Sequence, residues 1–356
     1  MSKQPIALLF NDIHVSKDNI SEFQNNWDEA LFICDKYSIG EIVIGGDLLH
    51  TRSSSQPLSV LMAVRQAIIK ATNADIHLTI AEGNHDKVDQ ESILGYCHLF
   101  SEYPNVTVVD DYTVMQIGDH AELYVMSYFP EQGSFAKRLK KIEDDIVSEK
   151  VGNSSKADDV RVLYIHEGIN GGLAQPSDNE LPTNIFRQFD SVLVGHYHDR
   201  KIIKNTHIEY IGASRQHNFG ENEEKGYTLL YDDGSYEFVK NQVNVRYKTI
   251  DITFKSLTNN FIERLGEIAS DGRYKVRTRI NCTEKEKDLI DRQKLIDAGA
   301  TKVEAVMEET EATSIASHSL EQKFDKDGIK QEYANFCADK GIKNVEMGLK
   351  YLDKIN

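Results

Sequence analysis

The chain has 356 residues, of which 40% are hydrophobic and 28% charged, and a formal net charge of −16 at pH 7. These proportions are those of an ordinary globular protein, long enough for two or three domains. The acidic surplus argues against a protein that coats nucleic acid non-specifically, because such binding depends on phosphate neutralisation by Lys and Arg. It leaves open a local basic path, or an acidic site that binds divalent cations.

The N-terminal region and the cysteines bear on the compartment. No stretch reaches the apolar length of a transmembrane helix, and residues 5–10 enter a strand without a charged and apolar leader before them. The cysteines are scattered without paired spacing, which favours reduced thiols over a disulfide framework or a zinc ribbon: Cys34, Cys97, Cys282 and Cys337. We expect a cytoplasmic protein of a bacterial or phage-infected cell.

Strands and helices alternate over the first hundred residues. Apolar runs at 6–10, 41–44 and 76–81 predict strands, and apolar residues at helical spacing predict helices over 23–37 and 57–71. This alternation is typical of a layered α/β domain. Each of the three strands runs into polar residues that can bind metal or move protons: Asp12 and His14, then Asp47 and His50, then Asn84, His85 and Asp86.

The middle of the chain repeats this design. Strands are predicted at 106–109, 123–128, 160–165, 191–194, 208–213 and 226–231, with a charged helix at 135–150. The strand at 160–165 ends in His166, and the strand at 191–194 runs into Gly195-His196-Tyr197-His198. Two imidazoles one residue apart at a strand end can project towards a common centre.

A second, smaller unit is expected to begin near residue 246. Residues 249–306 indicate a small βαβαβ unit, with helices at 260–269 and 284–298. A Glu-rich and Ser-rich linker follows, and 320–338 and 343–355 predict two short amphipathic helices. The expected domains are therefore residues 1–245, 246–312 and 320–356.

Five strand ends together supply seven candidate metal ligands: Asp12, His14, Asp47, Asn84, His166, His196 and His198. In open α/β sheets ligands bind outside the carboxyl ends of the strands, so these side chains can converge. Carboxylate, carboxamide and imidazole without thiolate suit Mn, Fe or Zn better than a structural zinc site. Seven ligands are too many for one tetrahedral ion, but fit two ions that share a bridging carboxylate.

The same positions resemble the calcineurin-like metallophosphoesterase signature, over roughly residues 5–235. The resemblance implies an α/β fold, a layered αββα sandwich, here with a small α+β capping domain and a C-terminal helix pair. It implies that one ion binds Asp12, His14, Asp47 and His198, and that the other binds Asp47, Asn84, His166 and His196. It further implies that His85 protonates the leaving oxygen or contacts the phosphate, and that Asp86 orients His85 by a hydrogen bond.

Narrower segments resemble one branch of that family. Gly46-Asp47-Leu48-Leu49-His50 is similar to a segment of the double-strand-break-repair nucleases, the family of bacterial SbcD and the "meiotic recombination eleven" proteins. Ile211-Gly212-Ala213-Ser214 and the following Asn218-Phe219-Gly220-Glu221 look like that family's next segment. His50 matches only part of the family, whose other members have Asp there, so a catalytic role is expected and a structural one stays open. Leu49 and Ala213 depart from the usual Phe and Pro without removing a ligand.

This resemblance implies a metal-dependent DNA exo/endonuclease subunit of a repair and recombination complex, with two divalent ions. Manganese is expected, with iron or zinc as alternatives. The partners implied are DNA, an SbcC-like coiled-coil ABC-type ATPase docked on the C-terminal helices, and a second copy of the chain, without a membrane. The dimer would use the helix at 57–71 and the stretch at 93–100, faces that core packing explains as well.

Two other functions stay open at this point. The same site could hydrolyse nucleotides or other small phosphate esters, or the chain could be a non-catalytic scaffold that binds DNA ends. The negative net charge is a poor fit for a protein that binds DNA. Eight basic residues are the candidates for a local basic path along which DNA could bind: Lys137, Arg138, Lys140, Lys141, Arg200, Lys201, Arg215 and Arg277.

Overall fold

A computed structural model describes residues 3–50, 55–152, 159–173 and 179–307, together with Lys330, Tyr333, Phe336, Cys337 and Val345. The chain divides into two compact units, one made of residues 1–249 and 267–276, the other of residues 250–266 and the chain from residue 277. Apart from those five positions, the predicted helix pair at 320–356 lies outside the described residues.

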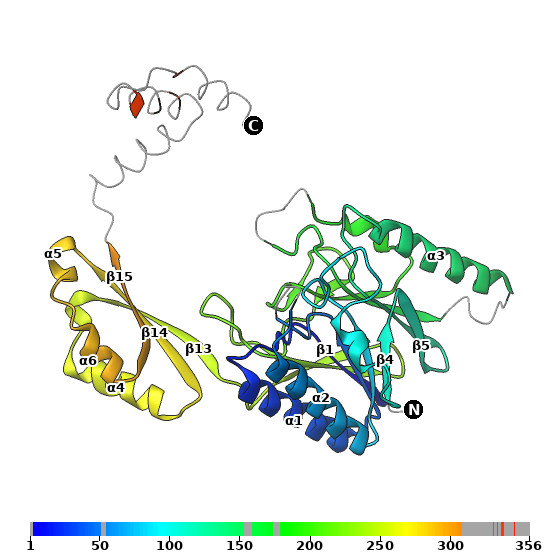
Figure 1. Ribbon diagram of the computed structural model, residues 1–356, viewed down its shortest axis with the longest axis horizontal. Helices are drawn as coiled ribbons and strands as arrows, with labels where there is room; N and C mark the ends of the chain where they lie inside the picture. The colour runs from blue at the N-terminus through cyan, green and yellow to red at the C-terminus, as the bar shows by residue number, and fades with distance from the viewer. Residues whose placement is uncertain are drawn as a thin grey trace. The chain divides into compact units, whose positions relative to one another are not determined.

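The first sheet is built around four parallel strands, β1 (Pro5–Phe10), β2 (Glu41–Gly45), β3 (His77–Ala81) and β4 (Val106–Val109). β11 (Gly226–Tyr231) and β12 (Tyr236–Lys240) add antiparallel strands, giving the order β12-β11-β1-β2-β3-β4. Two helices, α1 (Ile20–Tyr37) and α2 (Leu58–Asn73), connect the parallel strands and lie side by side along this sheet (Figure 1). The 3-10 helix η1 (Tyr96–Phe100) precedes β4.

The second sheet repeats the parallel pattern. β6 (Ala121–Met126), β7 (Val160–His166), β8 (Ser191–Gly195) and β10 (Ile208–Tyr210) are parallel neighbours. β5 (Tyr112–Gly118) and the two-residue β9 (Lys201–Ile202) pair antiparallel at the edges, so the order is β5-β6-β7-β8-β10-β9. α3 (Phe135–Gly152) joins β6 to β7, and the 3-10 helix η3 (Thr183–Phe186) precedes β8.

Strand alternation divides the core of the first unit into three apolar layers. In β1, Leu8 and Phe10 pack with the buried side of α1 and α2, whereas Ala7 and Leu9 pack against the second sheet. Successive side chains of a strand point to opposite faces, so a strand buried on both faces is apolar throughout. The outer face of the second sheet packs on α3 in the same way, through residues such as Leu163 and Phe135. These layers confirm the predicted αββα sandwich.

Parallel pairing also brings strand ends together. Phe10 pairs with Ile44 in the first sheet, and His166 pairs with Gly195 in the second. The loops that follow β1, β2 and β3 therefore leave one edge of the first sheet, and those after β7 and β8 leave one edge of the second.

The remaining elements are β13 (Arg246–Thr253), η4 (Phe254–Ser256), α4 (Asn259–Ser270), β14 (Tyr274–Cys282), α5 (Glu284–Lys287), α6 (Arg292–Asp297) and β15 (Ala300–Met307). The strands form a three-stranded sheet in the order β13-β14-β15. The prediction of a single helix at 284–298 is wrong. Asp291 caps a new helix by accepting a hydrogen bond from the Lys294 N–H at 3.0 Å, so α5 and α6 are separate.

Three edge strands, β5, β9 and β12, were not predicted from the sequence. Most side chains of β5 are exposed or half-buried, and β9 has only two exposed residues, so neither shows an apolar run. Within the described residues, no helix combines the length and the apolar character needed to cross a bilayer. All four cysteines are buried, and none of them forms a disulfide with another described cysteine.

Candidate metal centre

The loops after the strands hold their polar residues in a left-handed backbone conformation. Among the described residues, seven non-glycine residues have positive φ, and four of these are predicted ligands, namely Asp12 (51°), His14 (50°), Asp47 (53°) and His196 (89°). Such conformations cost about 1–3 kcal/mol each and concentrate at functional sites. Hydrogen bonds from the Asp12 N–H to Gly46 O and from the His14 N–H to Asp47 O, at 3.0 and 2.9 Å, tie two of these loops together.

In one half of the centre, an imidazole that follows the first sheet lies next to an imidazole that follows the second. His14 Nε2 lies 3.1 Å from His198 Nε2, and each of these atoms lies within 4 Å of Asp12 Oδ1, at 3.9 and 3.8 Å. Burial lowers the pKa of His14 well below its usual value, so its ring is neutral. The buried Nδ1 of His14 has no hydrogen-bond partner among the described residues. Converging nitrogen and carboxylate donors of this kind fit a divalent cation.

The other half gathers around His166 at the end of β7. Its Nδ1–H donates to Gly45 O at 3.0 Å, so Nε2 is the nitrogen that faces Asp47 Oδ2 at 3.2 Å and Asp12 Oδ1 at 3.8 Å. Burial opposes a proton on His166, but the two carboxylates outweigh it and raise its pKa to about 9. The His196 ring centroid lies 5.4 Å from that of His166. A divalent cation would satisfy the same carboxylates that attract this proton.

Asp47 lies between the two halves. Its Oδ2 atom is 3.5 Å from His14 Nε2 and 3.2 Å from His166 Nε2. Burial alone would raise the pKa of Asp47, but His166 lowers it below the usual range, so the carboxylate is ionised. Asn84, the remaining predicted ligand, is also buried, in the loop after β3. The structure thus brings six of the seven predicted ligands to one place, with Asp47 central. The end of β3, which carries Asn84, meets them through the backbone N–H of His85.

His85 lies beside this centre. Its backbone N–H donates to Asp47 Oδ1 at 2.8 Å, and its Nε2 lies 4.0 Å from Asp47 Oδ2. Its Nδ1–H donates to the main-chain carbonyl of His50, so this carbonyl orients the ring. The His50 side chain is exposed, and its ring stacks with that of His85 at 6.0 Å between centroids.

The predicted hydrogen bond between Asp86 and His85 is absent, because Nδ1–H of His85 donates to the His50 carbonyl instead. Asp86 is fully buried and accepts hydrogen bonds from three backbone N–H groups, those of Leu48 (3.2 Å), Leu49 (2.8 Å) and Gly83 (2.8 Å). Burial, with the neighbouring charge of Asp47, raises the pKa of Asp86 to about 8. Asp86 therefore fixes the loop after β2 against the loop after β3, and supports His85 only through the backbone.

Three residues at the centre were missed from the sequence. Asn11 donates a hydrogen bond to Asp12 Oδ2 and accepts one from the Tyr164 hydroxyl at 2.7 Å. Glu221 accepts one from His198 Nδ1–H at 2.8 Å, and His217 packs beside His14. Two features of the sequence could have pointed to these residues. Asn11 stands directly before the predicted ligand Asp12, and His217 and Glu221 lie at the two ends of the segment 217–221.

Close packing at Gly83 makes the centre sensitive to one added carbon. A Cβ at this position would lie 2.2 Å from Asp47 Oδ1 and 2.3 Å from Asp47 N. We expect Gly83→Ala to lower the free energy of unfolding by about 1–3 kcal/mol and to weaken divalent-cation binding, since Asp47 has to move. Gly40→Ala is the matched control, because nothing lies within 4 Å of its added Cβ. Chemical unfolding with and without Mn²⁺ measures both effects, and equal values for the two variants would contradict the packing argument.

Acidic partners surround most of the basic residues considered for a DNA path. Arg138 and Lys141 both pair with Asp111, at 2.7 and 3.7 Å, and Arg200 pairs with Glu209 at 2.5 Å. Lys140, Arg215 and Arg277 likewise contact Asp144, Glu22 and Glu304. Arg215 is buried and donates to the carbonyl of Ile13, so it braces the loop after β1. These pairs lower the positive charge that a phosphate backbone would meet.

Residues 7–200, more than half of the chain, match the family described as "Calcineurin-like phosphoesterase". The SbcD component of the nuclease SbcCD of Staphylococcus epidermidis is 29% identical over 213 residues, 53% of this chain and 54% of that protein. "Putative phosphoesterase 078R" of Invertebrate iridescent virus 3 is 24% identical over 265 residues, 71% of this chain and 70% of that protein. The chain therefore spans little more than half the length of the first of these relatives.

Among solved structures, the nuclease MPE of Pseudomonas putida is similar with 16% sequence identity and a TM-score of 0.26. That match covers 56% of this chain and 65% of the other.

Proposed function

Because the chain belongs to the calcineurin-like phosphoesterase family, we propose that it is a metal-dependent DNA nuclease that hydrolyses phosphodiester bonds. The observation that carries the proposal is the convergence of five strand ends on one centre, with Asp47 within 3.5 Å of His14 and His166. The family membership supports hydrolysis of phosphate esters, and the resemblance to a nuclease component supports DNA as the ester.

Two divalent ions, which we propose to be manganese, would occupy this centre. One would bind Asp12, His14, Asp47 and His198, and the other Asp47, Asn84, His166 and His196. When bound, such ions offset the charge of phosphate oxygens and make water acidic enough to act as a nucleophile near neutral pH. Donors without thiolate favour manganese or iron over a structural zinc ion.

The chain itself supplies orientation and a proton. The His50 carbonyl accepts the His85 Nδ1–H, so His85 Nε2 is the atom that would protonate the leaving oxygen. Gly45 O accepts from Nδ1–H of His166, and Glu221 accepts from Nδ1–H of His198, so in both rings Nε2 is the nitrogen that would bind an ion in place of a proton. Asp86 keeps the loops that carry Asp47 and His85 in register.

The proposed function is tested by comparing the hydrolysis of different phosphate esters. The purified full chain with Mn²⁺ is given linear double-stranded DNA, single-stranded DNA, a nucleoside monophosphate and a cyclic nucleotide in parallel. We expect cleavage of DNA that chelation abolishes and added Mn²⁺ restores. Hydrolysis of the small substrates alone would contradict the DNA assignment and leave the phosphoesterase chemistry standing. If the protein hydrolyses none of these substrates and binds no metal, the alternative of a non-catalytic scaffold that binds DNA ends is favoured.

A phosphodiesterase or phosphatase acting on small nucleotides is the second candidate. It is favoured by the acidic partners of Arg138, Lys141 and Arg200, and by the net charge of −16. A small phosphate ester needs only the metal centre, whereas duplex DNA needs positive charge along several phosphates. The same comparison of substrates distinguishes a DNA nuclease from an enzyme that acts on small nucleotides.

We also propose that two copies of the chain associate through α2 and the stretch before β4. Large apolar side chains are exposed there, with Leu58 74%, Leu94 62% and Leu99 61% accessible. We expect Leu58→Glu combined with Leu99→Glu to convert a dimer into a folded monomer, because two charges would have to be buried. Val147→Glu, at an apolar position of α3 that is 50% exposed, is the control. A dimer that survives the double change in analytical ultracentrifugation would rule out this interface.

A further proposed partner is a coiled-coil ATPase of the SbcC type, held by residues 320–356. The support is the resemblance to the SbcD component, since these residues lie almost wholly outside the described part of the chain. We expect deletion of residues 320–356 to abolish co-purification with a co-expressed ATPase of this type, while nuclease activity of the isolated chain persists. Retention of the complex after the deletion would assign its binding to another part of the chain.

A further inference from the structure

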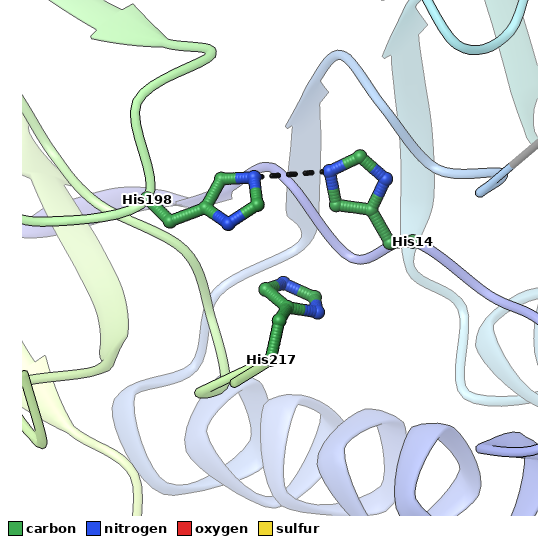
Figure 2. A group of neighbouring side chains, drawn as sticks. All are labelled: His14, His198 and His217. Atoms are coloured by element: carbon green, nitrogen blue, oxygen red, sulfur yellow. Dashed lines mark hydrogen bonds between the residues drawn. The ribbon is translucent and has the colours of Figure 1, made fainter. Parts of the chain in front are cut away.

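A third imidazole lies against the rings of His14 and His198. His217, from the loop between β10 and β11, has its ring centroid 5.0 Å from that of His14 and 4.7 Å from that of His198 (Figure 2). One nitrogen from each of the three rings lies within 4.8 Å of the others. None of the signature positions includes His217, so its place at the centre requires an explanation of its own.

The hydrogen bond of His217 identifies what its ring does. His217 Nε2 lies 2.8 Å from the main-chain carbonyl of Asp12. A carbonyl can only accept, so Nε2 carries the hydrogen and donates it. Asp12 has a φ of 51°, and its own N–H donates to Gly46 O at 3.0 Å. The backbone of Asp12 is thus held from both sides in a conformation that it would not adopt unaided.

One carboxylate links His217 to the second sheet. Glu221 Oε2 accepts from the backbone N–H of His217 at 2.9 Å, while Glu221 Oε1 accepts from His198 Nδ1–H at 2.8 Å. Lys225, which is fully buried, lies 3.5 Å from Glu221 and donates to the carbonyl of His198 at 2.6 Å. The loop at 217–225 therefore contacts Asp12 of the first sheet and His198 of the second at the same time.

We propose that His217 is a positioning residue of the metal centre, which holds Asp12 in its left-handed conformation and, with Glu221, fixes it against His198. The role rests on the proposed metal-dependent function. Its physical basis is that a bound ion needs donors from both sheets at fixed separation, and that partners behind the ligands commonly set metal affinity. His217 acts through the N–H group and does not have to touch the ion.

The test compares two replacements of His217 with a matched control. His217→Phe keeps an aromatic ring against His14 and His198 but lacks the donor, whereas His217→Gln keeps an N–H near the position of Nε2. His120→Phe is the control, because the His120 side chain is 79% exposed. Mn²⁺ binding to each full-length apo protein is measured by titration calorimetry without substrate. We expect His217→Phe to bind Mn²⁺ about 10–100-fold more weakly than wild type, and His217→Gln and His120→Phe to stay near it.

A second readout distinguishes positioning from a general structural defect. DNA cleavage by His217→Phe should recover at high Mn²⁺ concentration, because the loss is one of metal affinity. Unchanged Mn²⁺ affinity in His217→Phe would overturn the proposal, and so would a His217→Gln variant as weak as His217→Phe, since the ring would then be a ligand. If His217→Phe fails to fold, Glu221→Gln applies the same test through His198, with weakened Mn²⁺ binding expected and wild-type affinity contradicting it. Absence of Mn²⁺ binding in the wild type would instead contradict the proposed function itself.

Discussion

Replacing Asp47 by Asn is expected to lower phosphodiester hydrolysis by roughly 10²–10³-fold. Asp47 Oδ2 lies 3.5 Å from His14 Nε2 and 3.2 Å from His166 Nε2, so it is the carboxylate that both ions would share. Asn keeps the shape of the side chain but removes the negative charge that binds two cations. Initial rates on DNA at several Mn²⁺ concentrations measure the loss, which excess Mn²⁺ should not repair.

The same substitution should also abolish stabilisation by metal. Each ion that binds only the folded chain adds about 2.7 kcal/mol of stability at a hundred times its dissociation constant, so Mn²⁺ should raise the melting temperature of the wild type. Asp75→Asn is the matched control, because Asp75 also has a left-handed backbone, with a φ of 57°, but is exposed. If Asp47→Asn melts and reacts as Asp75→Asn does, Asp47 is not the shared ligand.

Replacing His85 by Ala is expected to lower the turnover of DNA by about 10²–10⁴-fold while Mn²⁺ binding stays near the wild-type value. His85 Nε2 lies 4.0 Å from Asp47 Oδ2, beside the ligands, and the carbonyl of His50 fixes its ring. Single-turnover cleavage and titration calorimetry on the same preparation separate the chemical step from metal binding. The control is His120→Ala, at a side chain that is 79% exposed.

A change of leaving group makes the role of His85 specific. An aryl phosphodiester releases a phenolate that is stable without a proton, whereas DNA releases an alkoxide that needs one. We therefore expect His85→Ala to lose much less activity on bis-p-nitrophenyl phosphate than on DNA. Equal losses on the two substrates would show that His85 does not act as the acid for the leaving oxygen, and would favour contact with the phosphate.

The strand ends could be predicted from the sequence because short-range patterns determine them. Apolar runs such as 6–10 and 160–165 mark buried parallel strands, and each runs directly into Asp12 or His166. Parallel pairing then forces these ends together without any knowledge of side-chain geometry. The αββα layering follows from the same runs, since a strand that is apolar on both faces has to be covered on both.

The contacts made by individual side chains could not be predicted in the same way. The sequence predicts that Asp86 holds His85, but in the structure its carboxylate accepts hydrogen bonds from three backbone N–H groups, one of them that of Gly83 in the same turn. His217 lies about 200 positions from Asp12 along the chain, and no strand end marks it. The pairing of Arg138 with Asp111 also depends on tertiary packing, so net charge alone misrepresents the local surface.

Counting the metal bound by the wild-type chain tests the central claim most directly. The full-length protein is stripped with chelator, equilibrated with Mn²⁺, dialysed, and analysed for metal and protein content. The convergence of Asp12, His14, Asp47, His166, His196 and His198, with Asn84 in the adjoining loop, predicts about two ions per chain. A value of one or zero at saturating Mn²⁺ would contradict a dinuclear centre at these strand ends.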